Sequence, residues 1–202
     1  MKYIKSFLIY ICLLFPLTGI AQKKQLQTVR DQIKSGKELM KAENTLRRLL
    51  VDSVSKKNNK IWLLLCDALT KQYEQGNEKL YLKQKYDTAA LFTVTRKLYD
   101  VMSRFDSLDA QPDAKGRVRA KYRAKHAEFL NSIRPNLFNG CSYFIHKKDY
   151  NTAFDYYSDY VLSANYPLFE GYDYMQKDAL IPHAAYWAMF CGYKLSDADK
   201  IM

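Results

Sequence analysis

The segment NGCSYFIHKKDYNTAFDYYSDYV, residues 139–161, decides the fold, because it holds seven aromatic residues in twenty-three. Its large apolar side chains recur at spacings of three and four, the period of an α-helix, on both sides of the polar sequence Lys147-Lys148-Asp149. Two helices joined by a short turn are predicted here. The aromatic rings then either fill the space between these helices or form a binding surface.

The helical period runs through most of the chain, which has only seven Gly and five Pro among its 202 residues. Short alternating runs between Asn-Gly or Asp-Gly turns, the signal of β-hairpins, are missing. The predicted fold class is therefore all-α. The expected helices cover 22–34, 37–54, 61–73, 87–105, 117–134, the two sides of the 139–161 segment with Pro135 in a first turn, and 179–195; loops are expected at 106–116 and 166–177.

The first residues have the pattern of a secretory signal peptide. Two lysines precede an apolar run over 7–15, and the small residues Gly19 and Ala21 place a cleavage site before Gln22. A retained membrane anchor is disfavoured, because the run is too short to span roughly 30 Å of hydrocarbon and a proline follows it. The sequence predicts a cleaved signal peptide over 1–21 and an exported protein of the periplasm or cell envelope, with one domain over 22–202.

The chain is strongly basic, with a net charge of +11. Without Lys2 and Lys5 of the leader, 30 basic residues face 21 acidic ones, a difference of +9. Export argues against a nucleic-acid partner and leaves anionic glycans, lipid headgroups or acidic proteins. The plainer interpretation, a solvated coat of Lys and Arg on helix surfaces, is favoured.

Three cysteines remain after the leader: Cys66, Cys141 and Cys191. An odd number at wide spacing is not a disulfide framework, and apolar neighbours indicate small buried residues. A bridge between Cys141 and Cys191 stays open as an alternative but is not favoured.

The spacing of small and large residues around Ala153 resembles a tetratricopeptide repeat. That family has a large residue, Leu-Gly and Tyr in its first helix, then Ala and an aromatic four residues later in its second. Partial matches to the same pattern begin at Trp62 and Ala185. The spacing from Ala153 to the corresponding position Ile201 is 48 residues, whereas the family period is 34. The matching positions of the best repeat are Leu137, Gly140, Cys141, Phe144, Ala153, Tyr157 and Tyr160.

The resemblance implies an irregular tetratricopeptide-like α-solenoid of antiparallel helix pairs, with an extension near 74–85. It also implies that the aromatic residues of the 139–161 segment are core. The combination of a leader with divergent repeats resembles exported proteins of Bacteroidetes. The sequence SDADKIM ends where a second helix should begin, so the chain is expected to be a fragment of a longer protein.

No catalytic pattern stands out, and a non-enzymatic protein without cofactor or metal is predicted. His126, His146 and His183 lack zinc-ligand spacing, and no glycine-rich phosphate loop is present. Asp155 and Asp159 share a helix face, which a solvated surface explains better than paired catalytic carboxylates.

The tetratricopeptide resemblance implies instead a concave groove for a peptide or protein partner, lined by exposed first-helix positions. The alternative is that the loop 166–177 or a neighbouring repeat covers this face. The groove residues are Phe138, Ser142, Ile145 and His146 from one repeat and Tyr186, Phe190, Tyr193 and Lys194 from the next.

A second function stays open beside the groove. The predicted helix 117–134 and the residues before it form a basic patch over 115–134, which would let a peripheral envelope protein bind anionic lipid or glycan. The residues of the patch are Lys115, Arg117, Arg119, Lys121, Arg123 and Lys125.

Overall fold

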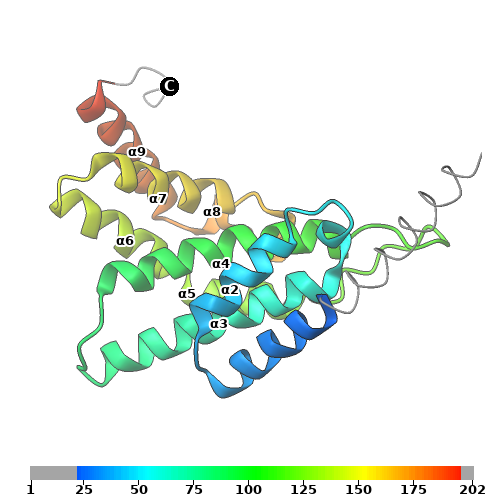
Figure 1. Ribbon diagram of the computed structural model, residues 1–202. Helices are drawn as coiled ribbons and strands as arrows, with labels where there is room; N and C mark the ends of the chain where they lie inside the picture. The colour runs from blue at the N-terminus through cyan, green and yellow to red at the C-terminus, as the bar shows by residue number, and fades with distance from the viewer. Residues whose placement is uncertain (1–21, 197–202) are drawn as a thin grey trace, which may run out of the picture. The chain divides into compact units, whose positions relative to one another are not determined.

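The computed structural model describes residues 22–196, and every regular element in that range is a helix. The predicted all-α class is confirmed. The chain divides into two compact units, one up to Lys71 and one from Gln72 onward. Figure 1 shows the elements in chain order from blue to red.

The first unit contains a helix over 22–35, α2 (Leu39–Leu49), the short 3₁₀ helix η1 (Ser55–Lys57) and the beginning of α3 (Asn59–Tyr81). Gly36 ends the first helix with a φ of 68°, a left-handed conformation that glycine adopts without strain. The predicted helix 37–54 is too long, because turns and η1 follow α2. The indole of Trp62 donates to the carbonyl of Lys56 at 2.8 Å and ties α3 to η1.

Helix α3 continues through the boundary between the units as far as Tyr81, so part of the extension predicted near 74–85 is helical. In the second unit Tyr73 packs edge-on against Phe129, with ring centroids 6.0 Å apart. Its hydroxyl accepts a hydrogen bond of 2.7 Å from the amide of Asn136.

The second unit is built on α4 (Thr88–Asp109), which packs against α5 (Arg123–Ile133), α6 (Pro135–His146) and α7 (Tyr150–Ser163). The carboxylate of Asp87 caps α4 by accepting from the amide of Ala89. The buried face of α4 carries apolar side chains at helical spacing: Leu91, Val94, Leu98, Val101, Met102 and Phe105.

The 139–161 segment forms the α6–α7 hairpin, with a turn over 147–149 (Figure 1). Gly140 lies so close to α7 that an added Cβ would be 2.7 Å from the ring of Tyr156. Among the positions predicted as core, Phe144 and Tyr150 are half-buried, and the others are buried: Leu137, Gly140, Cys141, Ala153, Tyr157 and Tyr160. Of the seven rings of this segment, three are buried, those of Tyr156, Tyr157 and Tyr160, and four are half-buried, so the segment contributes to the core without being wholly inside it.

After α7 the chain forms η2 (Pro167–Tyr172), α8 (Tyr174–Lys177) and α9 (Ile181–Leu195), which packs against α7. The predicted loop 166–177 thus consists largely of two short helices. Phe169 is buried there and lies 5.9 Å from the ring of Tyr99 on α4, so the segment closes one side of the second unit.

The predicted helix over 117–134 is wrong in its first part and in its last residue. Helix α4 runs on to Asp109, the chain over 110–122 is irregular, and α5 begins only at Arg123. Of the predicted basic patch, four residues lie before α5 and only Arg123 and Lys125 are helical.

Three predictions fall on residues outside the described range: the signal peptide over 1–21, the repeat position Ile201 and the end of the chain. Within 22–196, none of the helices is both long and apolar enough to cross a membrane.

Candidate functional site

The groove residues predicted on α6 are only partly accessible. Phe138 is half-buried, and its ring lies edge-on to Tyr157 and Tyr160 at centroid distances of 5.8 and 5.6 Å. Ser142 and Ile145 are half-buried as well. The ring Nδ1 of His146, which is exposed, lies 2.6 Å from the carbonyl oxygen of Ser142 on the same helix. Phe138 therefore packs on α7, and its remaining surface lines a small pocket of about 200 Å³ with Tyr160 and Leu180.

The residues predicted on α9 are more exposed. Tyr186 is 56% exposed and Tyr193 is 68% exposed. Phe190 is half-buried between Tyr150 and Trp187, with ring centroids 6.2 and 5.2 Å away. The ammonium of the exposed Lys194 lies 5.3 Å above the Phe190 ring. Phe190 thus holds α9 against α7, whereas the two tyrosines face outward.

Met189 completes a row with these tyrosines, since spacings of three and four place 186, 189 and 193 on one side of a helix. It is 45% exposed. We call Tyr186, Met189 and Tyr193 the α9 outer face. The sequence reasoning missed Met189, although the helical spacing from Tyr186 could have found it.

The opposite side of α9 is buried. Ala184 and Cys191 have no exposed surface, and Cys141 on α6 has none either. Burial raises the pKa of the Cys191 thiol to about 11. Burial also raises the pKa of the Cys141 thiol, and the neighbouring Cys191 raises it further. Both are free cysteines, so the bridge left open by the sequence is not formed.

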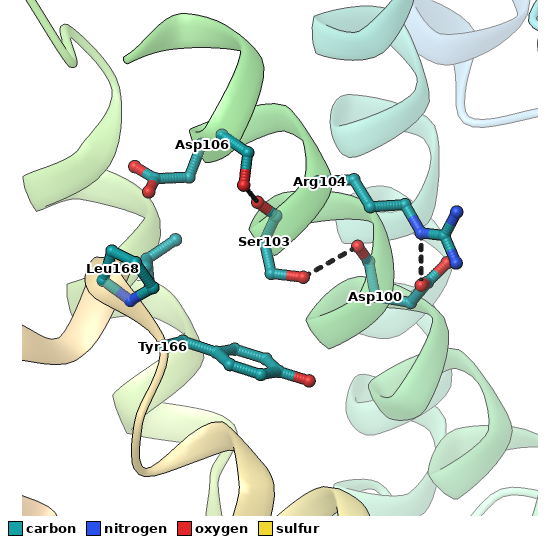
Figure 2. Close-up of a pocket in the computed structure, with 8 residues that line it drawn as sticks. Asp100, Ser103, Arg104, Asp106, Tyr166 and Leu168 are labelled. Carbon is teal, nitrogen blue, oxygen red and sulfur yellow. Dashed lines mark hydrogen bonds and ion pairs between the residues drawn. The ribbon is translucent and has the colours of Figure 1, made fainter. Parts of the chain in front are cut away.

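A small pocket of about 230 Å³ lies between α4 and the beginning of η2. Figure 2 shows Tyr166 on one side and Ser103, Asp100 and Arg104 of α4 on the other. The Arg104 guanidinium donates to Asp100 at 2.6 Å, and the Ser103 hydroxyl donates to the backbone carbonyl of Asp100 at 3.0 Å. Within the described residues no imidazole lines this pocket to activate the hydroxyl, so it offers polar contacts and no nucleophile–base pair.

Asp106 and Arg123 form a bidentate ion pair beside this pocket, with two bonds of 2.8 Å from the guanidinium. The carboxylate is 3% exposed, so the pair ties the first residue of α5 to α4. Arg123 also lines an open hollow of about 630 Å³ between α5 and η2. The other lining residues are mainly small and apolar: Ala120, Ala124, Ala127, Pro167, Leu168 and Tyr172.

His126, one turn into α5, packs against the rings of Phe105 and Tyr122 at 5.5 and 6.0 Å, and these two rings also contact each other. Its Nδ1 is buried and has no hydrogen-bond partner among the described residues. Burial, assisted by Lys125, lowers the pKa of its imidazole, while Asp106 and Asp109 oppose this effect. The neutral ring is therefore the form that this site favours.

Arg134 links α5 and α6 to the following segment through a buried cluster. Its guanidinium donates to Ser163 at 2.7 Å, to the Tyr160 carbonyl at 3.0 Å and to Asp178 at 3.3 Å. The rings of Tyr160 and Tyr174 lie 4.0 and 4.1 Å from it. The guanidinium makes these contacts within the protein, so the cluster serves to hold these elements together.

The carboxylates Asp155 and Asp159 face Arg96 on α4. The guanidinium lies 2.5 Å from Asp159 and 3.5 Å from Asp155, and it covers the ring of Tyr156. Burial raises the pKa of Asp159, and Arg96 opposes that rise. The two carboxylates therefore share an ion pair between helices and are not fully solvated as predicted.

The predicted basic patch lies mostly on the irregular stretch before α5. Lys115, Arg117, Arg119 and Lys121 are exposed there, and Arg117 is paired with Asp113 at 2.7 Å. The other two members differ from these four. Arg123 is half-buried and forms an ion pair with Asp106, whereas Lys125 is exposed on α5.

Among the described residues, no group of three His, Cys, Asp or Glu side chains is arranged to hold a metal ion. Cys141 and His146 do not form a thiol–imidazole pair, because the thiol donates to the Leu137 carbonyl and the imidazole lies against Ser142.

Comparisons with family models, with curated proteins and with solved structures find no match to this chain.

Proposed function

We propose that this chain is an exported, non-enzymatic interaction protein that binds a peptide or protein partner on the α9 outer face. The observation that carries the proposal is the exposure of Tyr186, Met189 and Tyr193 on a helix that buries Ala184 and Cys191 on its other side. Aromatic residues and Met are enriched where proteins dock, because they offer large contact area at low conformational cost.

The finer description of the fold is part of the same proposal: an irregular tetratricopeptide-like solenoid of the kind found in exported Bacteroidetes proteins. In its support, α6 and α7 form a hairpin with a three-residue turn, and α9 packs on α7 as a following repeat would. Gly140 lies at the close approach of the two helices, where the family pattern has a small residue.

The partner should present apolar or aromatic side chains, with acidic groups near the rim. The tyrosine rings and Met189 form the apolar centre, and Lys194 is exposed on the same helix. Phe190 supports this surface from within, since its ring packs on Tyr150 of α7.

The test is a pull-down from envelope extract, followed by affinity measurement with the captured partner, using the intact chain and Tyr186→Ala/Tyr193→Ala. Both tyrosines are exposed, so circular dichroism and the melting temperature should stay unchanged. Truncation of central contact residues costs upward of 2 kcal/mol, so at least a 30-fold weaker affinity is expected.

Leu162→Ala is the matched control, because Leu162 is another exposed apolar residue of the second unit, at 59%. Equal capture by the intact chain and by the double variant would contradict the proposal. Phe190 is left intact, since its contacts with Tyr150 and Trp187 would mix loss of binding with loss of stability.

A further inference from the structure

The stretch between α4 and α5, residues 110–122, is here called the cationic loop. Figure 1 shows it in green, extended beyond the ends of the two helices, and residues 111–119 are all exposed. Four basic residues and one acidic residue lie in it.

The cationic loop has a defined shape, because Asp113 organises it. The Asp113 carboxylate accepts from the amides of Lys115 and Arg117 at 2.8 and 3.0 Å, and from the Arg117 guanidinium at 2.9 and 2.7 Å. Gly116 closes the turn with a φ of 73° and a bond of 2.8 Å to the Asp113 carbonyl. The turn therefore presents its tip in a fixed conformation.

Most of the positive charge of the cationic loop is not neutralised. Asp113 compensates Arg117, and Asp109 accepts from the Tyr122 amide at the base of the loop. Lys115, Arg119 and Lys121 have no acidic partner within 4 Å in the described part of the chain, and Lys121 lies 5.2 Å from the Tyr122 ring.

Val118, in the stretch that follows the turn, stands between two arginines in the sequence and is 62% exposed. A solitary exposed Val is ordinary on a protein surface, but here it is exposed next to two exposed arginines, Arg117 and Arg119. An anionic glycan or a nucleic-acid backbone would satisfy the cations and gain nothing from this apolar side chain. A lipid bilayer satisfies both, with phosphates at its surface and hydrocarbon beneath.

We propose that the cationic loop is a docking site for an anionic lipid bilayer, with Lys115, Arg119 and Lys121 at the headgroup phosphates and Val118 entering the interface. This site is separate from the α9 outer face and does not depend on the proposed function. Each uncompensated cation near an anionic membrane surface strengthens partitioning about fivefold, so three favour anionic over zwitterionic bilayers by about 100-fold.

The test places a nitroxide spin label in the cationic loop through Val118→Cys in a Cys12→Ser background. Cys66, Cys141 and Cys191 are buried and stay unlabelled in the folded protein. The vesicles are phosphatidylcholine alone or phosphatidylcholine with one-third phosphatidylglycerol. On anionic vesicles the label should become less accessible to a water-soluble nickel complex and more accessible to oxygen, and high salt should reverse both changes.

Leu162→Cys, labelled in the same way, is the control for insertion elsewhere and should not respond. Replacing two cations by Arg119→Gln/Lys121→Gln should weaken partitioning about 25-fold. Lys83→Gln/Lys85→Gln removes the same charge from another exposed loop of the second unit and should leave partitioning unchanged. Residues 1–21 are common to all variants, so differences between variants report the cationic loop.

The proposal is overturned if the label at position 118 does not respond to anionic vesicles, or responds equally on phosphatidylcholine alone. An equal response at position 162 would also overturn it, since the loop would then not be the inserting element. Binding of heparin with the same salt dependence, without a response to vesicles, would assign the cationic loop to glycans instead.

Discussion

Gly140 occupies the closest approach of α6 to α7, and Gly140→Ala is expected to destabilise the second unit. The added methyl group would lie 2.7 Å from the Tyr156 ring and 3.3 Å from the Cβ of Phe92. Tyr156 is 1% exposed and stacked on Phe144, so the ring has no free space to enter. Overpacking of this kind costs about 1–3 kcal/mol, which urea unfolding would measure. Gly171→Ala, with nothing within 4 Å, is the control, and equal stability of both variants would contradict the expected clash.

Arg134→Met is expected to cost more, because it leaves the Asp178 carboxylate without its cation in a buried site. The two side chains are 5% and 13% exposed. Removing one partner of a buried ion pair costs about 3–5 kcal/mol. Arg104→Met breaks the exposed pair with Asp100 and should cost less than about 1 kcal/mol by the same unfolding measurement. Similar losses in both variants would show that burial does not decide the value of the Arg134 pair.

His126 should make folding stability depend on pH. Its pKa in the folded state is lowered by burial from the usual 6.5, so the unfolded chain binds the proton more tightly. The free energy of unfolding therefore falls as the pH drops through 6.5 and levels off below the folded-state pKa. His126→Phe keeps the ring contacts with Phe105 and Tyr122 and should remove this decline. Urea unfolding of both proteins between neutral and mildly acidic pH tests it, and parallel curves would contradict it.

Helix α7 depends on a single capping side chain at its start. The Asp149 carboxylate accepts from the amide of Thr152 at 3.1 Å. Asp149→Ala should lower the free energy of unfolding by about 1 kcal/mol, whereas Asp149→Ser should retain most of it, since serine is an equally good cap. Chemical denaturation distinguishes the two, and an alanine variant as stable as the serine variant would mean that the cap is dispensable.

The segments that form helices could be predicted from the sequence, whereas the residues at which some helices begin or end could not. The paired helices of 139–161 could be predicted, because the helical period is a local signal. The start of α5 could not, because it is set by the contact of Arg123 with Asp106, seventeen residues earlier, and by the turn around Asp113. No glycine or proline between 117 and 134 marks that boundary.

The candidate surface was predictable to a similar extent. Tyr186 and Tyr193 were placed on an accessible face, as found. Phe190 and Phe138 were expected beside them, yet both are drawn inward by rings on α7, namely Tyr150 for one and Tyr157 for the other. Such pairings join residues far apart in the chain, and spacing along one helix does not encode them.

The two compact units should unfold at different urea concentrations. Cys66 belongs to the first unit, and Cys141 and Cys191 belong to the second, all with buried thiols. In a Cys12→Ser chain, no thiol should react with a labelling reagent under native conditions. As urea is raised, Cys141 and Cys191 should become reactive together and Cys66 at a different concentration, because the two groups belong to different compact units. Mass spectrometry of labelled peptides would measure this, and one shared transition would mean that the units unfold as one.

The distribution of tryptophan has a practical consequence. The chain has two: Trp62 is buried in the first unit, and Trp187 is half-buried on α9 beside Tyr186 and Phe190. Each unit thus carries its own intrinsic fluorophore, and the one in the second unit lies next to the α9 outer face. Emission from a Trp62→Phe chain would report events at α9 alone, and emission from a Trp187→Phe chain would report the first unit, so both could be followed optically without any added dye.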